Sequence, residues 1–229
     1  MRPFTIGIAA LAVLVLLTAC GTDSGSGPKG SGVETSSRRE TTSFSRVDLR
    51  GAARVSIVVG RARSVTVRGD DNLTGRVETK VEGDTLAIST RSYRSEIGIS
   101  VEIGVPALDG IELSGSGTIG VHKLSGASFS ADLSGLGKIR IDGQTAKLVV
   151  DISGSGEAQL DRLSALAARV DISGLGDVSL TATNSLEASI SGSGDITYAG
   201  NPRRVAKDVS GSGSISAQLV TSPPLPGSP

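Results

Sequence analysis

The chain has 229 residues, with 23 Lys and Arg balanced by 23 Asp and Glu. This balance gives none of the basic excess that marks nucleic-acid-binding proteins, so we expect no nucleic-acid partner. The single cysteine excludes an intramolecular disulfide and a cysteine-based metal site. Aromatic residues make up 2% of the chain, which disfavours the aromatic platforms that line sugar-cleaving grooves.

The N-terminus has the pattern of a secretion signal. Met1-Arg2 gives a short positive start, and residues 6–17 form an apolar run too short to span a bilayer. The run ends in Leu17-Thr18-Ala19-Cys20, which resembles the bacterial lipobox. We predict a lipoprotein signal peptide over residues 1–19 and a diacylglyceryl group on Cys20; the alternative is an ordinary signal peptide with an incidental cysteine. Two or three acyl chains anchor stably, so the expected location is extracytoplasmic, lipid-anchored to the bacterial cell membrane.

Residues 20–42 are predicted to be the lipidated cysteine and a flexible linker. They are rich in Gly, Ser, Thr and charged residues, and Val33 is their only large aliphatic side chain. Such a segment buries too little apolar surface to order itself. Residues 221–229 contain four prolines and are predicted to be a disordered tail. The folded domain is therefore expected over residues 43–220.

The first half of this domain is predicted to contain short, irregular β-strands. Residues 77–81 and 85–88 are predicted to form a hairpin, because two β-rich runs flank a Gly-containing turn. No segment after the signal is a convincing amphipathic helix; residues 163–170 come nearest. We expect this half to cap the N-terminal end of the domain, since an open end exposes core and strand edges. Further strands are expected at residues 47–49, 55–59, 65–67 and 97–103.

The second half contains six copies of the motif Ser-Gly-x-Gly. Successive copies start 20, 19, 20, 18 and 19 residues apart. A near-constant period of this length is typical of a solenoid, in which each repeat buries its apolar face against its neighbours. We predict about six coils of about 20 residues over residues 109–220. The motifs start at Ser114, Ser134, Ser153, Ser173, Ser191 and Ser210.

Apolar and polar residues alternate on both sides of each motif. This period of two predicts strands with one buried face, so each coil is interpreted as strand, Gly-rich turn, strand and return loop. The glycines are expected where the backbone needs a positive φ or a close approach. A hairpin is possible for any one repeat, but the constant register favours parallel stacking. Lys207 is the one polar residue in the apolar column three positions before the motif.

The chain resembles the auto-transporter adhesin head GIN domain family, formerly a domain of unknown function. The resemblance rests on the opening Phe44-Ser45-Arg46-Val47, the step Val105-Pro106-Ala107-Leu108, the strand Ile111-Glu112-Leu113 and the repeated turns, and it covers about residues 43–220. It implies an all-β, right-handed parallel β-helix-like solenoid and a role in adhesion or surface interaction. The family has no established catalytic residues, so the resemblance implies none here.

An acidic ladder is the main candidate site. Two residues before each motif serine stands an acidic residue, except in the fifth copy, which has Ser189. Stacked coils would place these like charges about 5 Å apart, where they repel. The ladder is interpreted either as a stripe that binds cations or a cationic partner, or as a solvated outward face; we favour the second. Its members are Glu112, Asp132, Asp151, Asp171 and Asp208.

Other motifs carry weaker signals. Residues 115–120 match G-x-G-x-x-G, but a dinucleotide site needs a following helix and a strand is predicted instead. Asp177 and Asp195 follow Gly-x-Gly as in calcium-binding β-rolls, but the period and the spacing differ. His122 is the only histidine and has no convincing nucleophile partner.

The sequence therefore predicts a non-enzymatic, lipid-anchored surface or envelope module without a cofactor. Its expected partners are the membrane, through the lipid anchor, and an envelope protein or a glycan, through a solenoid face. A carbohydrate-binding or carbohydrate-active solenoid is the alternative. A third possibility is a structural envelope lipoprotein with no small ligand.

Overall fold

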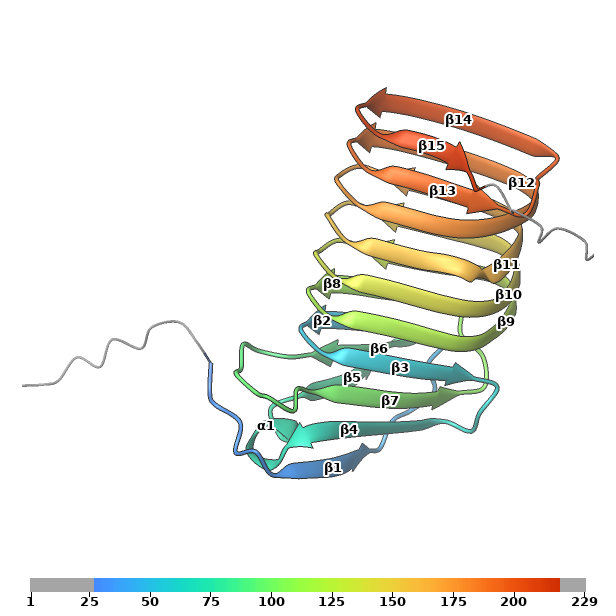
Figure 1. The fold of residues 1–229 in the computed structure, drawn as a ribbon. Helices are drawn as coiled ribbons and strands as arrows, with labels where there is room; N and C mark the ends of the chain where they lie inside the picture. The colour runs from blue at the N-terminus through green and yellow to red at the C-terminus, as the bar shows by residue number, and fades with distance from the viewer. Residues whose placement is uncertain (1–26, 219–229) are drawn as a thin grey trace, which may run out of the picture.

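The computed structural model describes residues 27–218 and is a mostly parallel β-solenoid (Figure 1). About five turns of the solenoid run from residue 110 onward, above an N-terminal part with a mixed sheet. The signal peptide, Cys20 and the proline-rich tail lie outside the described residues, so lipidation stays a prediction. None of the helices found in residues 27–218 has the length and hydropathy needed to cross a membrane.

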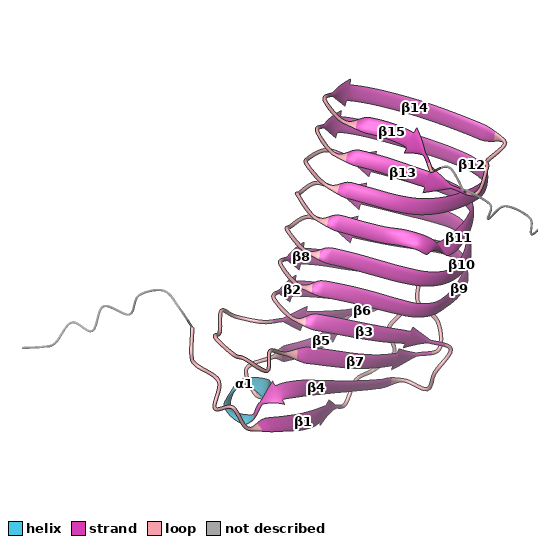
Figure 2. Cartoon of the chain, viewed as in Figure 1, coloured by secondary structure: helices cyan, strands magenta, loops and turns pink. Residues whose placement is uncertain are grey.

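The N-terminal part combines parallel and antiparallel strand pairs (Figure 2). The predicted hairpin is confirmed, since β5 and β6 pair antiparallel from Glu78↔Ser89 to Glu82↔Thr85. β4 is antiparallel to both β1 and β7. The elements are β1 (Glu34–Arg39), β2 (Arg46–Gly51), β3 (Arg54–Val59), β4 (Ser64–Asp70), α1 (Asp71–Thr74), β5 (Glu78–Glu82), β6 (Thr85–Ser89) and β7 (Ser100–Val105).

The prediction of a flexible linker over residues 20–42 is wrong for β1. This strand pairs with β4 over six residues at the edge of the sheet, so backbone hydrogen bonds to β4 hold it although its side chains bury little surface. The segment before it is held by the buried carboxylate of Asp70, which accepts hydrogen bonds from the Gly32 N–H at 2.7 Å and from the Ser95 hydroxyl. Backbone pairing and one buried acceptor thus order a segment that has almost no apolar side chains.

The stacking order differs from the chain order at the base of the solenoid. β2 lies between β6 and β8 (Gly110–Gly115), and β3 lies between β7 and β9 (Thr118–Leu133). The winding made of β2 and β3 is thus inserted between windings that come later in the sequence. This insertion ties the cap to the repeats through pairs such as Val47↔Ile111 and Val55↔Ile119.

The repeats stack in parallel and in register, as predicted. The separate return loop is wrong for the middle windings, because β9, β10 (Lys138–Ile152), β11 (Glu157–Ile172) and β12 (Asp177–Gly192) each run unbroken from one motif to the next. Each strand bends at the edge opposite the motifs, where the register shifts, as between Ile141 and Gly143. The solenoid ends with β13 (Asp195–Ala199), β14 (Arg204–Gly211) and β15 (Ser214–Ala217).

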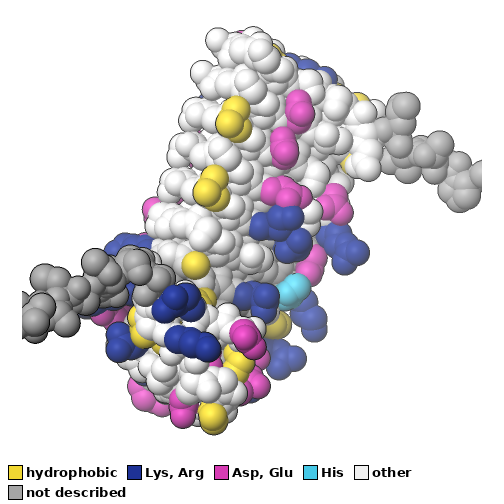
Figure 3. All heavy atoms as spheres, turned by 60° about the vertical axis from the view of Figure 1, so that its left-hand side comes forward, with side chains coloured by type: hydrophobic (Ala, Val, Ile, Leu, Met, Phe, Trp, Pro, Cys, Tyr) yellow, Lys and Arg dark blue, Asp and Glu magenta, His cyan; other side chains and the backbone are white. Residues whose placement is uncertain are grey.

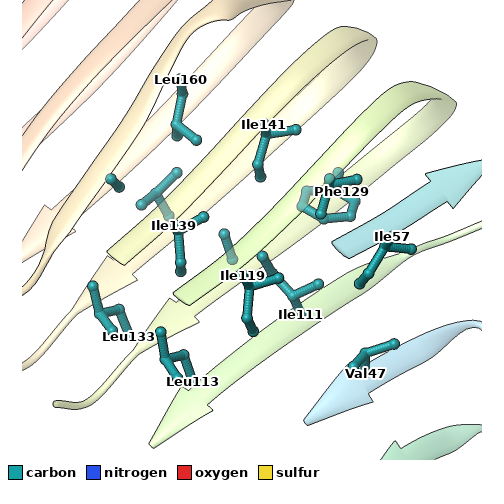
Figure 4. Packing of buried hydrophobic residues seen from close by; sticks show 14 of the residues in the cluster. Val47, Ile57, Ile111, Leu113, Ile119, Phe129, Leu133, Ile139, Ile141 and Leu160 are labelled. Carbon is teal, nitrogen blue, oxygen red and sulfur yellow. The ribbon is translucent and has the colours of Figure 1, made fainter. Parts of the chain in front are cut away.

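One hydrophobic core runs through the stack (Figure 4). The residue five positions after the motif serine is at most 2% exposed in five successive windings, where it is Ile119, Ile139, Ala158, Val178 and Ile196. The segment nearest to a helical pattern, residues 163–170, belongs to strand β11. At the last winding Lys207 covers the end of the core: its ammonium lies 4.8 Å from the Tyr198 ring centroid and donates to the Ile215 carbonyl at 2.9 Å.

The motif glycines serve close approach rather than positive φ. Within the six motifs, only Gly211 has a positive φ. A Cβ on Gly154 would overlap the carbonyl oxygen of Gly135 and lie 2.9 Å from its amide nitrogen. The turns also form their own backbone ladder, in which the residue after the first glycine donates to the first glycine one coil below, as Leu175 N does to Gly154 O at 3.0 Å.

Candidate functional site

The acidic ladder is one continuous column on the outer face of the solenoid. The strand register pairs Glu112 with Asp132, Asp132 with Asp151 and Asp151 with Asp171. Asp171 then pairs with Ser189, which pairs with Asp208. The structure thus brings together the five acidic residues singled out from the sequence, with Ser189 as a gap before the last.

The ladder has one further carboxylate that the sequence analysis missed. Asp48 pairs with Glu112, and its side chain is 4% exposed. Its Oδ2 accepts from Arg50 Nε at 2.7 Å, while its Oδ1 has no hydrogen-bond partner among the described residues. The signal was present, because residues 47–51 align with residues 111–115 as a degenerate copy of the strand and motif.

The two central carboxylates are electrostatically unfavourable. Burial raises the pKa of Asp132 and Asp151 above the ordinary aspartate value, and the carboxylate of the next coil raises each further. Arg46 Nη2 lies 3.8 Å from Asp132 Oδ2, and Arg169 lies near Asp151, but these cations lower the two pKa values only in part. Arg169 is shared, since its Nε lies 2.8 Å from Asp171 Oδ2.

A charge removal should therefore stabilise the fold. We expect Asp151→Asn to raise the free energy of unfolding at neutral pH by about 0.5 kcal/mol, because like charges directly opposite on neighbouring strands repel and solvent screens an exposed pair. Urea unfolding followed by circular dichroism measures the change. Asp208→Asn is the matched control, since Asp208 stacks on Ser189 and has no acidic neighbour in the register. Equal gains from both variants would contradict repulsion within the ladder.

The raised pKa of Asp151 also predicts how the free energy of unfolding depends on pH. A carboxyl with a raised pKa binds its proton more tightly in the folded state, so its contribution to stability is complete below the unfolded pKa near 3.8. That contribution is lost as the pH rises through the folded pKa. The stability difference between Asp151→Asn and the unchanged chain should therefore be largest at neutral pH and shrink as the pH falls toward 4, which urea unfolding across this range measures.

The cation interpretation of the ladder stays a prediction. A shallow cavity of about 160 Å³ lies against Glu112, Asp132, Asp151 and Asp171. Within residues 27–218, no three His, Cys, Asp or Glu side chains converge as the ligands of a metal ion would. Thermal melting with calcium at about 1 mM tests the idea: a raised Tm supports cation binding, and an unchanged Tm removes it.

A second acidic column lies on the other side of the turns, and the sequence analysis did not identify it as a column. Glu157 and Asp177 pair in the register, and Asp195 follows one coil later. Asp177 Oδ1 accepts from the Asp195 N–H at 3.2 Å, and Asp195 Oδ1 accepts from Ser214 N–H at 2.9 Å. The Gly-x-Gly-Asp sequences therefore join coils by hydrogen bonds from carboxylate to backbone, which gives both aspartates a structural role.

The turns themselves form a narrow edge that separates the two acidic columns. We call this the glycine edge; its outermost residues, in stacking order, are Ser116, Leu136, Ser155, Leu175, Ser193 and Ser212. Leu136 is 73% exposed and Leu175 is 62% exposed. Figure 3 views this edge and shows a row of hydrophobic side chains with acidic side chains beside it.

The weaker motifs of the sequence, which are interpreted as incidental, can also be placed in the structure. His122 Nδ1 lies 2.7 Å from Asp142 Oδ2, and no serine or cysteine of the described chain hydrogen-bonds the imidazole ring. Burial alone would raise the pKa of Asp142, but hydrogen bonds from the Lys123 N–H and from His122 outweigh it and lower that pKa. The second half of the G-x-G-x-x-G match already lies in strand β9, so no helix N-terminus faces a ligand there.

These features define a parallel β-solenoid whose glycine-rich turns line one edge between two acidic columns. Residues 43–202 match the family described as "Putative auto-transporter adhesin, head GIN domain". Because this match covers more than half of the 229 residues, the chain belongs to that family. A comparison with curated proteins finds no match.

Solved structures share the fold. A "putative adhesin" from Bacteroides fragilis has a TM-score of 0.70 and 20% identity, and the alignment covers 84% of this chain and all of that one. A "putative lipid binding protein" from Parabacteroides distasonis has a TM-score of 0.52 and 23% identity, again over 84% of this chain and all of the other. At these identities the likeness shows the fold alone. Neither the family description nor these structures' descriptions names a catalytic activity.

Proposed function

We propose that this protein is a non-enzymatic adhesion module, anchored to the bacterial cell membrane by lipid on Cys20, that binds an envelope or extracellular partner through its solenoid surface. One observation carries the proposal: consecutive coils keep like charges in register, although burial and then the neighbouring carboxylate raise the pKa of Asp132 and Asp151. The serine at position 189 of the same column is accommodated without a charge. A partner that neutralises the ladder explains why the carboxylates are kept.

The family agrees with this role, and so would the predicted anchor. A lipid on Cys20 would hold the N-terminal end near the membrane, so the repeats would point away from it. Membership of an adhesin head family agrees with a binding surface rather than an enclosed active site. The neighbour described as lipid-binding adds lipids as a second ligand class, which binding to lipid vesicles would test.

Two experiments test the proposal. Cys20→Ser should move the protein from the membrane fraction to the soluble fraction and remove acyl groups from its mass spectrum. Crosslinking on intact envelopes, together with glycan arrays, should then recover a partner with the unchanged chain and lose it with Asp132→Asn/Asp151→Asn/Asp171→Asn. Asp208→Asn should keep the partner. Cleavage of a bound glycan would favour the carbohydrate-active alternative, and binding that ignores the ladder would contradict the proposal.

A further inference from the structure

The glycine edge continues toward the N-terminal part into a pocket with an apolar floor. The Ala52 N–H, in the turn below the first motif, donates to Thr90 Oγ1 at 2.9 Å, and the Tyr93 hydroxyl donates to the Ala52 carbonyl at 2.5 Å. Thr90 and Tyr93 line a cavity of about 570 Å³, which we call the base pocket. The pocket and the exposed leucines therefore lie along one edge of the molecule.

The base pocket combines an apolar floor with a basic rim. Leu73, Val77 and Ile99 line it and are at most 5% exposed. Arg76 and Arg91 also line it and are exposed. Glu78 offsets part of this charge, since its Oε1 lies 3.7 Å from Arg91 Nη2. A pocket of this volume is ample for an aliphatic side chain with an acidic neighbour on each side.

Leu175 is an aliphatic side chain with an acidic residue on each side of it. It projects from the glycine edge with Asp171 before it and Asp177 after it, on the two sides of the turn. The fold does not need a leucine there, because Ser155 and Ser193 occupy the same position one coil below and one coil above. A leucine that is 62% exposed where serine suffices leaves an apolar side chain available for a contact.

The charges of the two halves are complementary. Residues 27–99 contain 13 Lys and Arg against nine Asp and Glu, whereas residues 100–218 contain nine against 13. In Figure 3 the base of this edge shows basic side chains among acidic ones, and further acidic side chains lie higher up, beside the row of hydrophobic side chains. A chain whose two halves carry opposite net charges complements an inverted copy of itself.

We propose that two copies of this chain pair antiparallel along their glycine edges, with Leu175 of each copy in the base pocket of the other. A two-fold axis satisfies both contacts at once, because Leu175 (the knob) and the base pocket lie on the same edge. The same axis closes the assembly at two copies. The inference rests on the proposed adhesive function and names its partner. Antiparallel pairing places the two N-termini at opposite ends, as contact between two cell surfaces would require.

The first test is the oligomeric state of the full chain with Cys20→Ser, which removes the predicted lipidation site. Sedimentation velocity at protein concentrations up to about 200 μM should show a reversible dimer with a Kd on the order of 10 μM, as expected for a small interface. Raising the salt from about 0.02 M to about 0.5 M should weaken the dimer, because the charged groups at its rim are exposed. A monomer at every concentration, or open-ended growth, overturns the inference.

Variants then test the knob and the pocket separately. Leu175→Ser should raise the Kd about tenfold or more while leaving the fold intact, since serine occupies this position in other coils. Leu166→Ser is the matched control, because Leu166 is 54% exposed and lies away from the glycine edge. Arg76→Glu/Arg91→Glu should weaken pairing as strongly as Leu175→Ser. Equal loss from Leu166→Ser would contradict a specific role for Leu175.

Mixing the two weakened variants gives the sharpest result. Leu175→Ser keeps an intact pocket, and Arg76→Glu/Arg91→Glu keeps an intact knob. Neither variant can make a native contact with itself, but a mixed pair makes one of the two. We expect a heterodimer that is tighter than either homodimer, and its absence would overturn the two-fold arrangement. A monomeric chain that still binds an envelope partner through the ladder would leave the proposed function standing and remove only this inference.

Discussion

Gly154→Ala should lower the free energy of unfolding by about 3 kcal/mol, a large effect for the addition of one methyl group. Gly154 packs directly on the turn one coil below. A Cβ at this position would meet the backbone of Gly135, with the carbonyl oxygen inside van der Waals contact and the carbonyl carbon at 3.0 Å. Backbone cannot rotate away as a flexible side chain can, so neighbouring coils must separate and weaken their hydrogen bonds. Urea unfolding followed by far-UV circular dichroism measures the loss.

Gly126→Ala is the matched control for this prediction. Gly126 lies in β9 of the same solenoid, its φ is not positive, and the nearest atom to an added Cβ is 3.8 Å away. Alanine fits there, so stability should change by less than about 0.5 kcal/mol. If Gly154→Ala and Gly126→Ala lose the same stability, the close approach of neighbouring coils at the turns is not the reason why the motif requires glycine.

Phe129→Ala should cost about 3–5 kcal/mol, the usual range for removing a buried aromatic side chain. Phe129 is 2% exposed and is one of the largest fully buried side chains of the described chain. It lies beside Leu148 in the register of β9 and β10, in the core shown in Figure 4. Alanine would leave a cavity that the rigid strands on either side cannot close.

The variant Phe129→Leu separates the loss of buried volume from the loss of the ring shape. Phe129→Leu keeps most of the apolar volume and should cost about 1.5 kcal/mol or less. The ratio of the two losses, measured by urea unfolding, therefore reports how well the core can repack. Similar losses for Phe129→Leu and Phe129→Ala would mean that ring shape, rather than buried volume, determines stability at this position.

The repeated half of the fold could be predicted because two periodic signals agree there. The spacing of the Ser-Gly-x-Gly motifs set the coil length, and the alternation around each motif set the buried face. Together they placed Ile139 in the core and Asp151 outside, and the ladder of acidic side chains followed from the same register. A signal that recurs in every coil is robust to one irregular member, such as Lys207.

The cap could not be predicted in the same way, because non-local pairing decides its structure. The likeness of residues 47–51 to residues 111–115 marks a coil strand, but it does not show that β2 and β3 insert between later windings. The burial of Asp48 depends on that insertion, since the carboxylate becomes buried only when β6 and β8 lie on either side of β2. β1 shows the same limit, because its pairing with β4 compensates for a sequence that lacks apolar side chains.

A pair of spin labels can measure whether successive turns stack in register along one edge. Ser116→Cys and Ser212→Cys, in a Cys20→Ser background, place labels on exposed positions five coils apart. With about 4.8 Å between parallel strands, pulsed electron paramagnetic resonance should give a narrow distribution centred at about 24 Å. Antiparallel hairpins would send the turns to both edges of the sheet, so a broad distribution or one centred beyond about 40 Å would contradict the account.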